Sequence, residues 1–82
     1  MYKILITKRA LKDLGKIDTK IKTRIGDKIK LLENDPIGSS KKLSTPIIGS
    51  FRFRVGDYRI IFDIEDDKVI ILRIGHRKDI YK

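Results

Sequence analysis

Hydrophobic and polar positions alternate most regularly over residues 51–62, which read FRFRV-GD-YRIIF. Alternation with a period of two is typical of half-buried strands, and a Gly-Asp pair between two such runs is typical of a tight turn. A two-residue loop at 56–57 places Arg54 opposite Arg59. The pattern therefore predicts a β-hairpin with one apolar face and one polar face, and the polar face carries Arg52, Arg54 and Arg59.

Three guanidinium groups on one face of a hairpin need an explanation. Like charges that lie opposite each other across a strand pair destabilise the pair. A ligand of opposite charge would offset this cost, and a polyanion is the simplest such ligand. Guanidinium is a rigid fork that grips phosphate through two N–H bonds. The hairpin therefore predicts a phosphate-binding surface.

A short strand and a short helix are predicted before the hairpin. Residues 3–6 are suited to a strand, and Thr7 is suited to the N-cap of a helix that continues to about Leu14. Gly15 then ends this helix, because glycine readily adopts the conformations found after a helix C-terminus.

A second helix is predicted to begin after Asp18 and to end at Asn34-Asp35-Pro36. Its apolar residues recur at spacings of three and four, which is typical of one buried stripe, and Leu31 widens that stripe. Gly26 lies inside the helix, where glycine is unfavourable relative to alanine, so we expect close packing at this position. The stripe consists of Ile21, Ile25, Ile29 and Leu32.

A last strand is predicted from Lys68 to about Ile74. Ile70, Leu72 and Ile74 form its stronger apolar set and are assigned to the helix-covered face, which places Arg73 with the other arginines. A two-residue turn at 66–67 would give the opposite arrangement, so this assignment requires an odd-length loop or a β-bulge there.

These elements follow the order β-α-α-β-β-β and predict a single α+β domain over residues 1–82. Two N-terminal helices are expected to pack on one face of a four-stranded, mainly antiparallel, twisted sheet. The other face stays partly uncovered and is called the open face below. Residues 37–50 form the least regular segment, and its Lys41 and Lys42 are placed beside the arginines.

Composition narrows the function classes. The chain has 82 residues, a net charge of +9 and no cysteine, which excludes disulfides and thiolate metal sites. The short apolar start does not resemble a signal peptide, and no apolar run approaches the length of a membrane span, so a cytoplasmic protein without a membrane partner is expected. The charge favours nucleic acid, an anionic surface or an acidic protein as partner. Lysines predominate up to Lys42 and arginines after it.

Few catalytic arrangements are compatible with the sequence. It shows no catalytic triad spacing and no glycine-rich phosphate loop, and its acids lie mainly in turns and on helix surfaces, which does not favour a two-metal nuclease. No cofactor and no metal are expected. RNA can instead be cleaved by its own 2′-hydroxyl if a base, an acid and cations surround the phosphate. The cations would come from Arg52, Arg54, Arg59 and Arg77.

Proton transfer would fall to Tyr81 or His76. The pKa of a tyrosine is ordinarily about 10, but nearby positive charges lower it by favouring the phenolate. Structural roles stay open for these residues: His76 as a surface residue, Tyr81 as a packing residue and Arg73 as an ion-pair partner. Tyr58 lies on the apolar face and is assigned to the core.

Three segments of the chain together resemble the RelE/ParE superfamily of prokaryotic toxins. They are residues 7–14 (TKRALKDL), the hairpin at 51–62 and the ending GHRKDIY at 75–81, and the resemblance covers essentially the whole chain. It implies a microbial RNase fold and, for RelE-like members, cleavage of messenger RNA in the ribosomal A site, restrained by an antitoxin.

The resemblance also implies roles for individual residues. Tyr81 corresponds to a general base, whereas Arg52, Arg54, Arg59 and Arg77 correspond to residues that stabilise the transition state and assist the leaving group. Arginine replaces the lysine often found at the first two positions, and because arginine does not readily give up a proton, both are cast as charge stabilisers. Supporting roles are assigned to His76 and Arg73, and RNA binding to Lys41, Lys42, Lys78 and Lys82.

The sequence thus favours a toxin with ribosome-dependent endoribonuclease activity. Its expected partners are the ribosome with its mRNA and rRNA, and an acidic antitoxin in a heterodimer or heterotetramer. One alternative is a ParE-like inhibitor of DNA gyrase with the same fold. Another is a basic RNA-binding module without catalysis.

Overall fold

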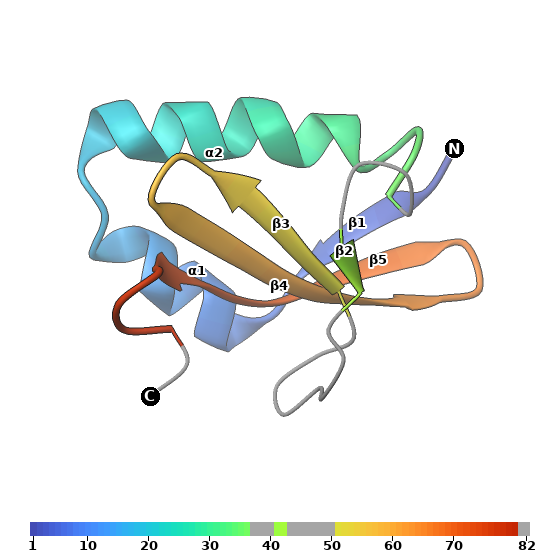
Figure 1. The fold of residues 1–82 in the computed structure, drawn as a ribbon. Helices are drawn as coiled ribbons and strands as arrows, with labels where there is room; N and C mark the ends of the chain where they lie inside the picture. The colour runs from blue at the N-terminus through green and yellow to red at the C-terminus, as the bar shows by residue number, and fades with distance from the viewer. Residues whose placement is uncertain (37–40, 43–50, 81–82) are drawn as a thin grey trace.

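The computed structural model describes residues 1–36, 41–42 and 51–80, and shows a helical layer packed on a twisted sheet (Figure 1). The elements follow the predicted order, with one short additional strand before the hairpin. The helices are α1 (Lys8–Gly15) and α2 (Thr19–Leu31). The strands are β1 (Lys3–Ile6), β2 (Lys41–Lys42), β3 (Phe51–Val55), β4 (Tyr58–Glu65) and β5 (Lys68–His76).

The strands lie in the order β1-β5-β4-β3-β2. Strand β1 runs parallel to β5, and the other neighbouring pairs are antiparallel. The predicted two-layer α+β fold with a mainly antiparallel sheet is therefore confirmed. The two-residue β2, which pairs with Arg52 and Phe51, extends the four predicted strands at the hairpin edge and comes from the segment that looked irregular in sequence.

Both predicted helix starts are confirmed. The Thr7 hydroxyl accepts a hydrogen bond from the Ala10 N–H at 3.2 Å, and the Asp18 carboxylate accepts one from the Lys20 N–H at 3.1 Å. These side chains satisfy backbone donors that have no partner within the first helical turn. The helices bury Ala10, Ile25 and Ile29 in a core shared with the covered face of the sheet, and Leu32, the C-cap residue of α2, is buried in the same core.

Two details of the second helix differ from the sequence prediction. Leu31 is 49% exposed, because it lies at the end of α2 on the side away from the core. Gly26 is also exposed, and a Cβ atom added there would have no neighbouring atom within 4 Å. Close packing therefore does not explain the glycine at this position.

The central hairpin has the predicted register. Val55 pairs with Tyr58, Arg54 with Arg59, and Phe53 with Ile60. Gly56 adopts φ +59° in the two-residue loop, a conformation that glycine reaches without steric cost. Phe51 and Phe62 stack across the strands with ring centroids 5.5 Å apart.

The predicted faces of β5 are correct at its C-terminal end and wrong at its N-terminal end. Ile74 is buried in the core, as expected. Val69 and Ile71 are also fully buried in the core, whereas Ile70 and Leu72 are only partly buried. The reason is that Glu65 pairs with Lys68, so the loop at 66–67 has two residues and no bulge.

The required bulge is present, but in the middle of β5. Ile61 pairs with Arg73 and Phe62 with Ile71, which leaves Leu72 as the extra residue. A bulge reverses the faces of the residues that follow it, so Arg73 returns to the open face. The Thr7 hydroxyl donates to the Ile71 carbonyl at 2.9 Å, which fixes the start of α1 beside this irregularity.

Candidate nucleic-acid interface

The sheet register brings the predicted arginines into two adjacent rows on the open face. One row contains Arg54, Arg59 and Gly75 on β3, β4 and β5. The other contains Arg52, Ile61 and Arg73 on the same strands. Because neighbouring strands are about 4.8 Å apart, each row spans about 10 Å. The structure therefore places Arg73 of β5 on the same face as the arginines of the hairpin.

Arg54 is the most accessible arginine of these rows. Its side chain is exposed, and no ion pair within the described ranges involves it. Arg52 is partly buried and makes contacts of its own. Arg54 therefore offers a guanidinium that an external phosphate can reach without breaking an existing ion pair.

Arg59, in contrast, is only 7% exposed. Its Nη1 donates to the Gly56 and Tyr58 carbonyls, both at 3.0 Å. Arg59 is therefore buried, although the alternation of the hairpin placed it on the polar face with the accessible arginines. Arg59 pairs with Arg54 across the hairpin, as the sequence predicted. The repulsion between the two charges is reduced because the Arg59 guanidinium turns toward the hairpin loop.

Arg77 lies at the other side of that loop. Its backbone N–H donates to the Asp57 carbonyl at 2.8 Å, and its guanidinium Nε is 3.8 Å from the Asp57 carboxylate. Both side chains are more than half exposed, so this ion pair is weak and open to exchange with another anion. The backbone bond holds Arg77 beside the hairpin loop.

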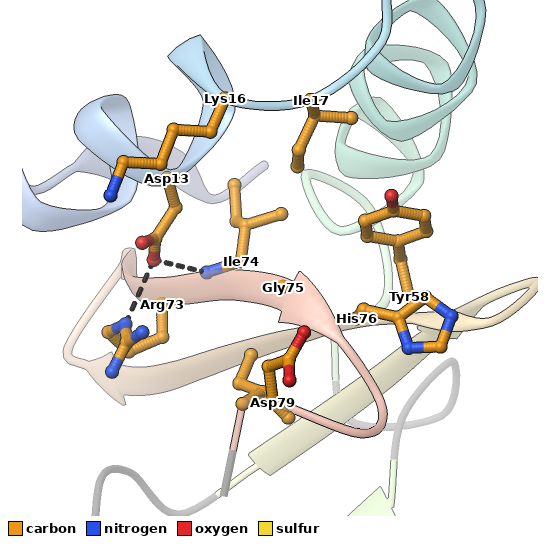
Figure 2. A pocket seen from close by; sticks show the side chains of 10 residues that line it. Asp13, Lys16, Ile17, Tyr58, Arg73, Ile74, Gly75, His76 and Asp79 are labelled. Carbon is orange, nitrogen blue, oxygen red and sulfur yellow. Dashed lines mark hydrogen bonds and ion pairs between the residues drawn. The ribbon is translucent and has the colours of Figure 1, made fainter. Parts of the chain in front are cut away.

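Arg73 is engaged by a carboxylate from the helical layer. Its Nε donates to Asp13 Oδ2 at 2.9 Å, and the same oxygen accepts the Ile74 N–H at 3.0 Å, as Figure 2 shows. Strand β1 pairs with β5 only as far as Ile71, so Asp13 takes the place of a strand partner at this edge. The sequence left open whether Arg73 supports the site or forms an ion pair, and the structure shows the ion pair.

His76 contacts Tyr58 edge to face, with ring centroids 5.4 Å apart. Its Nδ1 accepts a hydrogen bond from the Lys78 N–H at 3.2 Å, which requires the lone pair of this nitrogen. Tyr58 is partly buried and packs against the core, close to its predicted role. His76 therefore has a local structural role at the end of β5.

The remaining predicted residues are described only in part. Lys41 and Lys42 form β2, whose backbone pairs with β3 beside Arg52. Lys78 is exposed in the turn after β5. Tyr81 and Lys82 lie outside the described residues.

A pocket of about 350 Å³ lies where the end of α1, the end of β5 and the C-terminal turn meet (Figure 2). Acidic and basic groups line it together, since Asp13, Lys16, Arg73 and Asp79 all contribute. Its charges are thus balanced, unlike those of the open face. The pocket separates α1 from the segment that carries Arg77.

Sequence reasoning missed Arg24, which belongs to the exposed side of α2. Its Nη2 lies 3.8 Å from the position that a Cβ atom of residue 56 would occupy. Arg24 therefore adds a third guanidinium around the loop at 56–57, next to Arg59 and Arg77. The spacing within α2 gives no sign of this, because the contact depends on how the helix crosses the hairpin.

The residues that the structure describes contain no group of three or more His, Cys, Asp or Glu side chains that could hold a metal ion. None of the helices formed by these residues is long and apolar enough to cross a membrane.

Comparisons with known proteins agree on one family. Residues 4–81 match the family described as the ParE toxin of type II toxin–antitoxin systems. Toxin RelG of Mycobacterium tuberculosis is 34% identical, over 99% of this chain and 97% of the relative, and toxin RelE3 of Methanocaldococcus jannaschii is 35% identical, over 96% and 94%. The toxin–antitoxin complex RelBE2 of M. tuberculosis contains a chain with a TM-score of 0.84 and 32% identity, over 93% of this chain and 98% of that one.

Proposed function

The chain belongs to the RelE/ParE family of toxins of type II toxin–antitoxin systems, and we propose that it is a ribosome-dependent endoribonuclease that cleaves messenger RNA in the A site. The observation that carries this proposal is the accessible pair Arg54 and Arg77. Both are exposed. Arg54 lies on β3 directly opposite Arg59, and Arg77 follows the end of β5 beside the loop at 56–57.

The proposed reaction is a transesterification within the RNA. The 2′-oxygen attacks the adjacent phosphorus and loses its proton to a base, the bond from phosphorus to the 5′-oxygen breaks, and that oxygen takes up a proton. The products are a 2′,3′-cyclic phosphate and a 5′-hydroxyl end. Negative charge accumulates on the phosphorane oxygens, so cations fixed around them lower the barrier.

The proposed role of each arginine depends on how exposed its side chain is. Arg54 and Arg77 contact the phosphate, and Arg52 extends the cationic surface along β3. Arg59 contributes positive charge from beneath the open face and holds the hairpin loop through its bonds to Gly56 and Tyr58. Tyr81 is proposed to take the proton from the 2′-hydroxyl, the role that the family resemblance implies.

The lysines are proposed to bind RNA less specifically. Lys78 follows Arg77 in the exposed turn, and the β2 backbone brings Lys41 and Lys42 to the hairpin edge. RNA binding is also proposed for Lys82. Lysine is a mobile point charge, which suits contacts with many phosphates in no fixed geometry.

An acidic antitoxin is the proposed protein partner. The net charge of +9 and the exposed Arg54 favour a segment with Asp or Glu side chains that covers the open face. Complementary charge accelerates such an encounter and makes it sensitive to salt. Covering Arg54 would block access of phosphate to the proposed site.

Inhibition of DNA gyrase is the second candidate, because the matching family model is that of the ParE toxin. To separate the two, the protein is induced without an antitoxin, and the 5′ ends of a translated mRNA are mapped by primer extension. Cuts in phase with codons are expected. Intact mRNA together with altered plasmid supercoiling would instead indicate inhibition of DNA gyrase.

Variants make the experiment specific to the proposed site. Arg54→Ala should abolish the cuts, whereas Lys22→Ala should not, although both remove one positive charge from an exposed side chain. Lys22 lies on α2, in the helical layer on the far side of the sheet. If the two variants cut equally well, net charge and not the open face would account for the activity.

A further inference from the structure

The motif at residues 75–81 contains two residues that the proposed chemistry does not use, Gly75 and Ile80. Ile80 is 1% exposed although it lies outside the main core, in the turn that follows β5. Three of its side-chain carbons lie 3.5, 3.5 and 3.8 Å from the position of a Cβ atom built on Gly75. The chain thus returns after five residues and packs Ile80 on the glycine.

Gly75 lies in the row of the open face that also contains Arg54 and Arg59. A side chain larger than a methyl group there would extend into the space that Ile80 fills. A small residue at this position therefore lets the C-terminal turn lie directly on the sheet, next to the arginines.

Hydrogen bonds complete the attachment of this turn. The Asp79 and Ile80 N–H groups both donate to the His76 carbonyl, at 2.9 and 3.0 Å, and the Arg77 N–H donates to the Asp57 carbonyl at 2.8 Å. The turn is therefore tied to the end of β5, to the hairpin loop and, through Ile80, to the sheet surface.

We propose that Gly75 and Ile80 form a latch that positions the C-terminal turn for catalysis. This inference rests on the proposed ribonuclease function. Arg77 lies between His76 at the end of β5 and Ile80, within the same turn. Fixing Ile80 on Gly75 thus limits the movement of the backbone that carries Arg77. Gly75 and Ile80 are positioning residues, since neither supplies a reacting group.

Substitutions at Gly75 separate the latch from the rest of the fold. The Cβ atom of Gly75→Ala would lie in ordinary contact with Ile80, so the latch should hold. Gly75→Val adds two methyl groups that extend into the space held by Ile80, so the turn should lift from the sheet. Ile80→Ala removes the packing group and should release the turn without any clash. Gly26→Ala is the control for glycine replacement, because a Cβ atom at that exposed helical position meets nothing within 4 Å.

Amide hydrogen exchange, measured by NMR on the full chain, reports on the latch directly. In Gly75→Val and in Ile80→Ala, the Asp79 and Ile80 amides should exchange at least about tenfold faster, while core amides such as that of Ile60 keep their rates. Gly75→Ala should keep the protection of the parent. If the Asp79 amide exchanges at the parental rate in Gly75→Val and Ile80→Ala, there is no latch.

Single-turnover cleavage on programmed ribosomes tests the positioning role. Both latch-breaking variants should reduce the cleavage rate about 10- to 100-fold, the scale expected when reacting groups are displaced by about 1 Å. Their ribosome affinity should stay within about threefold of the parent, since Arg54 still binds phosphate. The control Gly26→Ala should cleave like the parent. Rapid exchange at Asp79 with an unchanged cleavage rate would overturn the positioning role.

The double variant Gly75→Val with Ile80→Ala tests whether the two single substitutions act through contact between these two positions. The valine should fill part of the space left by isoleucine, so the double variant should be protected and active above the level of Gly75→Val alone. Equal or greater loss in the double variant would overturn the proposed contact. If the parent itself cuts no mRNA, the proposed function fails, whereas the exchange measurement still decides whether the latch exists.

Discussion

The carboxylate of Asp13 links the end of α1 to the edge of β5, and its removal should destabilise the fold markedly. Oδ2 accepts from Arg73 Nε at 2.9 Å and from the Ile74 N–H at 3.0 Å. A third, longer contact joins Oδ1 to Arg9 Nε at 3.8 Å. The Asp13 side chain is only 11% exposed, so water does not easily replace these bonds.

The expected magnitude follows from the two short bonds. A hydrogen bond to a charged group contributes about 1.5–3 kcal/mol, and a buried donor left without a partner costs about 1–3 kcal/mol. Because Arg73 is 22% exposed and can turn to water, the full sum is not reached. We expect Asp13→Ala to lower the free energy of unfolding by about 2–3 kcal/mol. For a domain of this size that corresponds to a fall of about 10–20 °C in Tm.

Urea denaturation of the purified chain, followed by circular dichroism, measures this loss. Asp13→Asn keeps an acceptor but loses the charge, so it should cost about half as much. Asp27→Ala, an exposed acid on α2, is the matched control and should stay within about 0.5 kcal/mol of the parent. In a double-mutant cycle with Arg73→Ala, the coupling energy should be about 1 kcal/mol or more. A loss below about 0.5 kcal/mol in Asp13→Ala would refute the role assigned to this carboxylate.

Three further outcomes are expected. Arg54→Ala should leave the free energy of unfolding within about 0.5 kcal/mol of the parent but reduce mRNA cleavage about 100- to 1000-fold. Arg59→Ala should lower the free energy of unfolding by about 1–3 kcal/mol in urea denaturation, and equal stability of the two variants would contradict this. Tyr81→Phe should reduce single-turnover cleavage at least about 100-fold with ribosome binding retained, and His76→Gln should reduce it less; the reverse order would exchange their roles. Binding of an acidic antitoxin, measured by calorimetry, should weaken as salt rises, and salt-independent affinity would argue against coverage of the open face.

Most of the fold was predictable from the sequence because its signals are local. Thr7 and Asp18 cap the helices in which they were predicted, and the alternation around Gly56 specified the hairpin register. In each case a short-range bond or a period of two determines the structure, and neither depends on distant parts of the chain.

The errors concern contacts between distant segments. The bulge at Leu72 was placed in the preceding loop, because the strength of the apolar sets in β5 does not reveal where the strand changes face. It lies beside Thr7, whose hydroxyl bonds to the Ile71 carbonyl 64 positions away. The position of the bulge thus depends on how α1 docks, which no pattern within β5 encodes. The bond from Asp13 to Arg73 is hidden from sequence for the same reason.

The burial of Arg59 changes what the arginine pattern means. Opposed arginines suggested that a polyanion must offset their repulsion, and Arg54 and Arg59 are indeed opposed. The hairpin reduces that repulsion internally, since Arg59 Nη1 donates to two backbone carbonyls while Arg54 stays exposed. Carbonyl dipoles stabilise one guanidinium without neutralising it. The open face therefore keeps its positive charge in the absence of a ligand, and the case for phosphate binding depends on Arg54 and Arg77, which an anion can reach, more than on the repulsion itself.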